Sequence, residues 1–302
     1  MITKRPAFLG FLIAFIGAIL FSTKAIIVKK AFADVHVEAL TLLAIRMLFS
    51  LPFYLIAAVL LYRQPMNVKM TGKEWMLTIA LGIFGYYLSS LFDFVGLQYI
   101  SAGLERLILF LYPSFAVLIN AIVFKQPIPK IQRWALLLSY VGIGIAYFGE
   151  LTIDTSNPNF FYGSFLIFLC SITYSIYIVG TGRMVPKIGA GKFTTYSLLS
   201  STAGVLIHYA IAGNHDALHQ SFDLWWYGIL LAIVATVIPT FMLSFSMKKI
   251  GSNKVAIISS IGPVSTILQA HFVLGEKIFA EQIIGTIMVL VGVLLLALKT
   301  KK

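Results

Sequence analysis

Ten long apolar stretches, joined by short connections, constrain this chain more than any other feature. An α-helix needs about 20 consecutive apolar residues to cross the hydrocarbon core of a bilayer. The stretches lie, with ends placed to within a few residues, at 8–28, 38–61, 75–96, 102–124, 132–149, 161–180, 192–212, 226–247, 254–274 and 278–298. Strands of a membrane barrel would alternate apolar and polar residues, whereas runs such as 286–298 are apolar on every face. The sequence therefore predicts an all-α integral membrane protein with ten transmembrane helices.

The low charge content excludes most other classes of protein. Only 11% of the 302 residues are charged and 59% are hydrophobic, whereas a soluble protein carries roughly 25% charged residues. So few charges cannot cover a water-exposed surface, which excludes an ordinary soluble enzyme and a disordered chain. The single Cys170 excludes a disulfide scaffold. The net charge of +12 comes from basic residues scattered in short runs, so we expect no nucleic-acid partner.

The basic residues set the orientation, because cytoplasmic loops are enriched in Lys and Arg. With the N-terminus placed inside, 17 of the 23 basic residues fall in inner segments. Lys29, Lys30 and Lys277 fall outside, and the remaining three lie within spans. We therefore expect a multi-pass protein of the cell (inner) membrane with both termini in the cytoplasm. The first span also imitates a signal peptide, but its apolar run is longer than a typical signal core.

The two halves of the chain match at an offset of 150 residues. Pro113 aligns with Pro263, and Gly142 aligns with Gly292; further matches are Ile100 with Ile250, Leu118 with Leu268, Ile128 with Ile278 and Gln132 with Gln282. Each half holds five spans, an odd number, so corresponding spans cross the membrane in opposite directions. We therefore expect two inverted repeats, 1–150 and 151–302, an arrangement that many secondary transporters use. The paired prolines are candidates for kinks or gating, the alternative being ordinary membrane prolines.

These residues resemble the drug/metabolite transporter superfamily, in its branch with two tandem EamA repeats. The resemblance is strongest in 245–298, where it rests on Ile250-Gly251-Ser252, Pro263, Gly275-Glu276, Gly285 and Gly292. In the first half it rests on Tyr99-Ile100-Ser101-Ala102, Pro113, Gly142, Gly144 and the second-span Arg46. The first half departs from the pattern at Lys125-Gln126, where Gly-Glu is usual. The resemblance implies a ten-helix carrier of small metabolites, often one that exports amino acids or related compounds.

Five charged residues fall inside the predicted spans, and a charge inside a membrane is by default a functional candidate. They are Lys24, Arg46, Asp93, Glu105 and Arg106, and all lie in the outer half of the membrane. Lys24 and Asp93 lie about 24 Å and about 27 Å from the inner edge on a helical rise of ~1.5 Å per residue, so they are expected to pair. Glu105 and Arg106 are interpreted as structural, because adjacent residues near a helix end can reach headgroups or water. Two readings remain open: ion pairs that lock the helices, or a site for a charged substrate or a proton.

Helical spacing groups further polar residues with these charges. Tyr86, Ser90 and Asp93 share one face of the third span, and Glu105 and Tyr112 share one face of the fourth. The candidates for substrate binding or ion coupling are Lys24, Arg46, Tyr86, Ser90, Asp93, Glu105, Arg106, Tyr112, Tyr174, Tyr177, Gln269 and His271. For the tyrosines, packing is the favoured alternative. Small-residue stripes at Gly285 and Gly292, and around Gly142, indicate close helix packing or a homodimer seam.

No motif of an enzyme or of a cofactor site is found in the sequence. A phosphate-binding Gly-Lys-Ser/Thr loop, a His-Glu-x-x-His pair and Gly-x-Ser-x-Gly are absent. We therefore expect no catalytic residue, metal or cofactor. The favoured hypothesis is a secondary carrier, more readily an exporter, of a small-molecule substrate by alternating access, with a proton or another ion as a candidate for coupling. An uptake carrier, a membrane-embedded enzyme and a scaffold are the alternatives.

The orientation yields a direct test. A reporter enzyme that works only in the cytoplasm should be active when fused after Lys302 and silent when inserted in the 150–160 connection, because the basic residues hold the inner segments in the cytoplasm. Reporter activity of fusions in intact cells measures this. The reverse pattern would contradict both the orientation and the ten-span count.

Overall fold

The computed structural model describes residues 4–63, 68–153, 158–216, 222–250 and 252–298, and within these ranges it is helical and contains no strand. Three short π-helical segments, η1, η3 and η4, lie between α-helices. The elements are α1 (Lys4–Val35), α2 (Ala39–Tyr62), α3 (Gly72–Gly82), η1 (Ile83–Leu88), α4 (Ser89–Gly96), α5 (Ala102–Leu109), α6 (Tyr112–Phe124), α7 (Lys130–Ile153), α8 (Phe160–Ile188), α9 (Ala190–Ala212), α10 (Phe222–Ala232), η3 (Ile233–Val237), α11 (Ile238–Ile250), α12 (Ser252–Ser259), α13 (Gly262–Gln269), η4 (Ala270–Leu274) and α14 (Ala280–Leu298).

Eight helical stretches within the described ranges are long and apolar enough to cross a membrane. Two of the ten predicted spans are outside this set. The described apolar stretch of α14 is shorter, Ala280–Leu295. The 23-residue α9 carries six Ser and Thr residues, which lower its hydropathy. Several of these hydroxyls bond inside the helix, as Thr202 Oγ1 does to the Leu198 carbonyl at 2.9 Å, so α9 exposes fewer free polar groups than its composition suggests.

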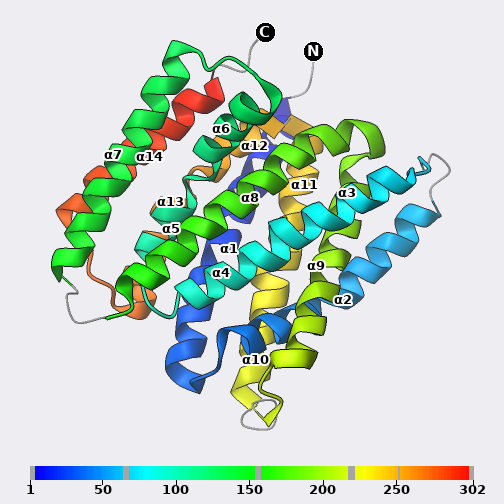
Figure 1. Ribbon diagram of the computed structural model, residues 1–302, viewed down its shortest axis with the longest axis horizontal. Helices are drawn as coiled ribbons and strands as arrows, with labels where there is room; N and C mark the ends of the chain where they lie inside the picture. Colours follow the sequence, from blue (N-terminus) through cyan, green and yellow to red (C-terminus); the bar gives the residue numbers. More distant parts are fainter. Residues whose placement is uncertain (1–3, 64–67, 154–157, 217–221, 251, 299–302) are drawn as a thin grey trace.

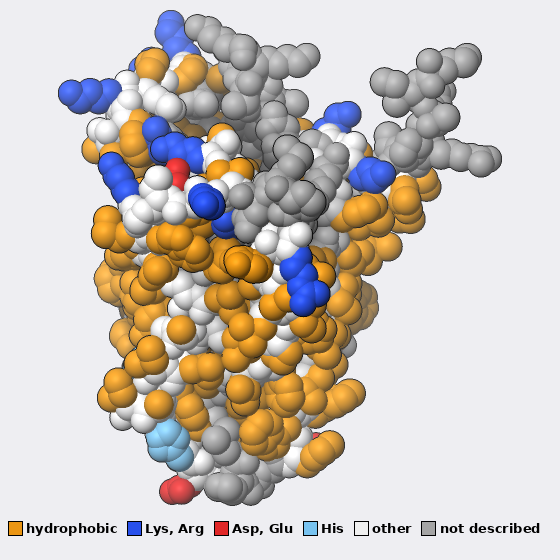
Figure 2. All heavy atoms as spheres, turned by 90° about the vertical axis from the view of Figure 1, so that its right-hand side faces the viewer, with side chains coloured by type: hydrophobic (Ala, Val, Ile, Leu, Met, Phe, Trp, Pro, Cys, Tyr) orange, Lys and Arg blue, Asp and Glu red, His pale blue; other side chains and the backbone are white. Residues whose placement is uncertain are grey.

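The outer surface is largely apolar. Large hydrophobic side chains such as Ile211 and Ile122 are 81% and 77% exposed. In Figure 2 such side chains form a broad belt, with Lys and Arg side chains gathered above it. α1 begins and α14 ends at that same upper end, called the termini end below (Figure 1). An apolar surface of this extent on a helical protein marks a contact with lipid, so the chain is a multi-pass membrane protein.

Backbone irregularities recur at the 150-residue offset. Two helices are interrupted at equivalent points, 110–111 and 260–261, and Lys125 and Gly275 both adopt a left-handed conformation with φ of 52° and 72°. Further equivalent pairs are the starts of α3 and α10 at 72 and 222, of η1 and η3 at 83 and 233, and of α7 and α14 at 130 and 280. Shared interruptions and π segments are far less readily matched by chance than apolar residues are.

Pro113 and Pro263 lie in the first turn of α6 and of α13, respectively. The expected kinks within continuous helices are therefore full interruptions. At each one the chain tightens before the proline, with Leu111 N–H donating to the Ile108 carbonyl at 3.0 Å and Ile261 N–H to the Ile258 carbonyl at 3.2 Å. A proline suits the first turn because its missing donor is not needed there.

The helices α7 and α14 form an antiparallel pair held by small residues. A Cβ on Gly142 would lie 2.8 Å from the Gly285 carbonyl oxygen, and one on Gly292 would lie 2.8 Å from the Ala135 carbonyl oxygen. Residue numbers therefore rise along one helix as they fall along the other. The small-residue stripes serve packing within the chain here, because only glycine lets two backbones approach this closely.

The two halves interlock through α1 and α8. In α1, a Cβ on Gly17 would lie 3.1 Å from Met242 Cβ of α11. In α8, a Cβ on Gly163 would lie 3.2 Å from the side chain of Ile100, just before α5. The first helix of each half therefore packs against helices of the other half.

Replacing Gly142 tests the α7–α14 packing. Gly142→Ala should lower the free energy of unfolding by about 1–3 kcal/mol, the usual cost of overpacking, because its Cβ would meet Met288 Cβ at 2.7 Å. Gly144→Ala is the matched control, because a Cβ there meets no atom within 4 Å. Thermal unfolding in detergent measures both variants, and an equal loss in each would contradict the packing argument.

Candidate functional site

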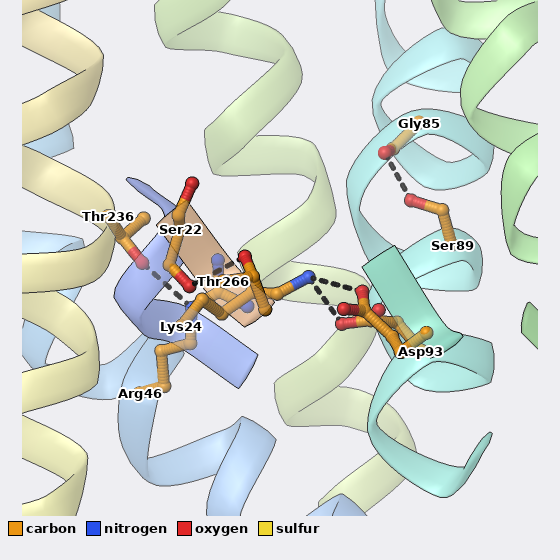
Figure 3. A network of polar contacts seen from close by, with 9 residues as sticks. Ser22, Lys24, Arg46, Gly85, Ser89, Asp93, Thr236 and Thr266 are labelled. Carbon is orange, nitrogen blue, oxygen red and sulfur yellow. Dashed lines mark hydrogen bonds and ion pairs between the residues drawn. The ribbon is translucent and has the colours of Figure 1, made fainter. Parts of the chain in front are cut away.

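Three buried charged side chains meet between α1, α4 and α5. Lys24 Nζ lies 2.6 Å from Asp93 Oδ2 and 3.7 Å from Glu105 Oε1. Lys24 and Asp93 point toward one another in Figure 3, and Lys24, Asp93 and Glu105 are 8%, 1% and 0% exposed. The pairing of Lys24 with Asp93 expected from their depths is therefore present. Asp93 and Glu105 therefore share the Lys24 ammonium group as an ion-pair partner.

Two arginines flank this group and bind neutral partners. Arg46 Nε donates to Thr236 Oγ1 at 2.9 Å, and its guanidinium lies 5.4 Å from the centre of the Phe94 ring. Arg106 Nη2 donates to Ser22 Oγ at 3.4 Å, and its guanidinium lies 5.7 Å from the ring centre of Phe21. Within the described residues, neither arginine has a carboxylate partner within 4.0 Å.

The expectation that Glu105 and Arg106 reach water or headgroups is wrong. They are 0% and 6% exposed, although they lie in the first turns of α5. The reason is that α5 packs against α1, α7, α8 and α13, and its first turn is covered by polar groups from other parts of the chain. The positions of Glu105 and Arg106 along the sequence gave their depth in the membrane but could not show that other parts of the chain bury them.

That cover consists of three charged side chains around the start of α5. The Glu276 carboxylate accepts hydrogen bonds from the N–H groups of Ala102 at 2.9 Å and Gly103 at 3.3 Å. Glu150 accepts from the Ser101 hydroxyl at 2.8 Å, and Lys29 Nζ donates to the Ile100 carbonyl at 2.9 Å. The first N–H groups of a helix lack partners within it and attract carboxylates. This group, called the α5 latch below, links the start of α5 to α1, α7 and the connection before α14. It lies at the end of the molecule opposite the termini.

A cavity of about 460 Å³ lies beside the α5 latch, and Lys29, Glu150 and Glu276 line it together with Gln282. The latch was not predicted as a unit. The sequence signals for it were the Gly275-Glu276 and Tyr99-Ile100-Ser101-Ala102 motifs, whereas Lys29 and Glu150 lie near the ends of distant helices.

Four tyrosines form a continuous aromatic cluster between η1, α6 and α8. The ring centres of Tyr112 and Tyr174 lie 5.0 Å apart, and those of Tyr86 and Tyr177 lie 5.2 Å apart. Tyr174 and Tyr177 link the two pairs at 6.0 Å. Tyr177 is buried and the other three are partly exposed. The tyrosines predicted separately on three spans therefore gather in one place, which we call the tyrosine cluster.

Three predicted candidates lie apart from the charged group. Ser90 is buried on α4, one turn before Asp93. Gln269 donates to Ser265 Oγ at 2.8 Å on its own helix. His271 is exposed, and its Nδ1 lies 2.9 Å from the Glu276 carbonyl oxygen, at the latch end. Gln269 and His271 therefore do not join the charged group.

Small hydroxyl residues that sequence reasoning missed complete the site. Ser22 accepts from Arg106, and its hydroxyl donor lies 2.9 Å from the Ala18 carbonyl oxygen and 3.3 Å from that of Gly262, beside the second interruption. Thr236, the partner of Arg46, lies in η3 and donates to the Leu231 carbonyl at 2.8 Å. In the first half, the Ser89 hydroxyl bonds to the Gly85 carbonyl in the same way (Figure 3). The π segments thus place site residues, a feature that residue patterns do not reveal.

The site offers buried charged groups and aromatic rings as possible contacts for a ligand. Across the described residues, no three or more His, Cys, Asp or Glu side chains gather in a way that could hold a metal ion. Cys170 is free and buried.

Comparisons with known proteins agree with this architecture. The model of the EamA-like transporter family matches the chain twice, at residues 8–148 and 161–298. The protein named uncharacterized transporter YcbK, from Bacillus subtilis (strain 168), is 32% identical, over 93% of this chain and 90% of its own length. An uncharacterized transporter from Haemophilus influenzae is 26% identical, over 89% of this chain and 91% of its own. One crystal structure shares the fold, with a TM-score of 0.64 and 17% identity over 96% of this chain and 98% of that chain.

A double-mutant cycle tests the Lys24–Asp93 pair. Lys24→Met should destabilise the protein by about 3–5 kcal/mol, because it strands buried carboxylates. Asp93→Asn should cost less, because Lys24 keeps Glu105 at 3.7 Å. The double variant should lose less stability than the sum of the two single losses, although Glu105 then lacks its ammonium partner, and the difference measures the coupling between the two residues. Unfolding followed by thermal denaturation in detergent measures it. Strictly additive losses would show that the two residues do not interact.

Proposed function

Because the chain belongs to the EamA-like transporter family, we propose that it is a secondary transporter that moves a small metabolite, such as an amino acid or a related compound, by alternating access. The observation that carries the proposal is the buried group of Lys24, Asp93 and Glu105, flanked by Arg46 and Arg106. Charges are costly inside a membrane and mark substrate or ion pathways there. No described feature of the fold needs five of them in one place.

The proposed architecture is ten membrane-spanning helices in two inverted repeats, 1–150 and 151–302. The recurrence of interruptions, π segments and left-handed residues at the same offset supports the repeat. The antiparallel packing of α7 and α14, which are equivalent in the two halves, supports its inversion. Inverted repeats allow one half to rock against the other around a fixed site.

The interruptions provide a place for movement. The α5–α6 interruption separates Arg106 from Tyr112, and the α12–α13 interruption is followed by Gly262, whose carbonyl oxygen binds Ser22. Discontinuous helices commonly form the binding sites of transporters. A shift of either half-helix would therefore alter the partners of Arg106 directly.

The proposed orientation has the termini end in the cytoplasm of a cell that carries the protein in its plasma membrane. The gathering of Lys and Arg side chains at that end supports it (Figure 2). The α5 latch then closes the outer side. We propose export as the direction, with Asp93 and Glu105 as the carboxylates available for proton coupling; uptake is the alternative.

A ligand screen followed by counterflow tests the proposal. The purified protein is heated in the presence of amino acids, organic acids or cationic drugs, because a ligand of the folded state raises the unfolding temperature. Compounds that do so are tested for exchange across proteoliposomes. Exchange that saturates with concentration supports a carrier, and the absence of both stabilisation and exchange contradicts it.

Replacing the paired prolines tests the role of the interruptions. Pro113→Ala and Pro263→Ala each restore a helical N–H donor, so that a continuous helix can form across the interruption. We expect exchange of the screened substrate to fall severalfold while expression and monodispersity stay near those of the wild type. Pro52→Ala is the matched control, because Pro52 lies exposed inside α2, away from any interruption. Normal exchange in both test variants would contradict the proposed role.

A further inference from the structure

The buried charges of the site do not balance. Three cations, Lys24, Arg46 and Arg106, face two carboxylates, Asp93 and Glu105, and none of the five residues is more than 8% exposed. One positive charge is in excess even when both carboxylates are ionised. A proton on either carboxylate raises the excess to two. The sign of the imbalance is therefore the same for every protonation state of the two acids.

The excess lies on the two arginines. Lys24 is occupied by Asp93 at 2.6 Å and Glu105 at 3.7 Å. The contacts of Arg46 and Arg106 are hydroxyls and phenyl rings, and Arg46 Nη1 and Arg106 Nε have no hydrogen-bond partner within the described part of the chain. A buried guanidinium without an anion is costly, and its planar set of donors matches a carboxylate.

The tyrosine cluster lies beside both arginines. The Arg46 guanidinium is close enough to Tyr54, Tyr86 and Asp93 for its charge to act on them, and Arg106 is similarly close to Tyr112, Tyr174 and Glu105. Tyr54 lies two helical turns after Arg46 on the same face of α2, and its buried hydroxyl has no partner within the described residues. Three of the four cluster tyrosines are partly exposed. Aromatic rings and unpaired guanidinium donors thus lie in one region of the protein.

We propose that Arg46 and Arg106 bind the anionic group of the transported molecule, and that the tyrosine cluster holds its planar, apolar body. The ligand class is a small organic anion with a carboxylate on a flat ring. This inference rests on the proposed transport function and specifies its substrate. The anion supplies the missing negative charge, and it accepts the donors that Arg46 Nη1 and Arg106 Nε leave free.

Three probes of similar size test which sign of charge the ligand carries. Benzoate, benzamide and benzylamine share one ring and differ in charge at neutral pH. Each is titrated into the purified full-length protein while the unfolding temperature is recorded. Benzoate should raise that temperature in a saturable way, and the other two should not. Stabilisation by benzylamine or benzamide but not by benzoate overturns the proposal, as does the absence of saturable stabilisation by benzoate.

Arginine variants then locate the anion. Arg46→Gln and Arg106→Gln should each weaken benzoate binding about tenfold or more. Arg46→Lys and Arg106→Lys should retain part of the binding, because they keep the charge and lose the fork of donors. Arg133→Gln is the matched control, since Arg133 is exposed at the start of α7, and it should bind as the wild type does. Benzoate binding that is unchanged in both Gln variants overturns the assignment.

Folding and transport are measured separately from benzoate binding. Monodispersity and helical circular dichroism identify any variant that fails to fold, and the comparison of the three probes on the wild type remains decisive in that case. Counterflow of any amino acid or cationic drug without benzoate binding would leave the transporter proposal standing and overturn the anion site. Failure of counterflow with every compound, despite benzoate binding, would overturn the transport function instead.

Discussion

A buried lysine and aspartate of the first half, 2.6 Å apart, join two groups of helices on which the rest of the structure is built. Lys24 belongs to α1, which packs along α10–α13 of the second half, whereas Asp93 belongs to α4, which packs along α8. The pair therefore couples two bundles that each contain helices from both halves. Taking both charges out of water is costly unless they remain together, so movement of α1 relative to α4 has to be matched by a new partner for each charge.

Continuous and interrupted helices both supply the site. The α7–α14 pair is continuous and is fastened at Gly142, Gly285 and Gly292, where the backbones nearly touch. Lys24, Arg46 and Tyr177 also lie on continuous helices, α1, α2 and α8, whereas Arg106 lies before an interruption, Thr236 within η3 and Tyr86 within η1. Closely packed interfaces are not continuously deformable, so the irregular segments are the part of the site where the backbone can adjust most readily.

Much of the fold could be predicted from the sequence, because membrane spans and their offset depend on local composition and spacing. The meeting of Lys24 with Asp93 was predictable from depth alone. The burial of Glu105, the neutral partners of Arg46 and Arg106, and the α5 latch were not, because each depends on side chains more than 40 residues away in the chain. Helical faces indicated which tyrosines share a side, but only packing could show that three helical elements bring them together.

The two halves differ at the connection that follows each interrupted helix. In the second half, Glu276 places a carboxylate on the N–H groups of Ala102 and Gly103. The residue 150 positions earlier, Gln126, has an uncharged amide side chain. Its backbone N–H donates to the Asn120 carbonyl at 3.2 Å, as that of Glu276 does to the Ala270 carbonyl. The partial positive charge of a helix N-terminus stabilises a carboxylate but not an uncharged amide. Because salt screens the attraction between a carboxylate and a helix N-terminus, the strength of the α5 latch depends on ionic strength, whereas the uncharged Gln126 side chain adds no such dependence at the equivalent connection.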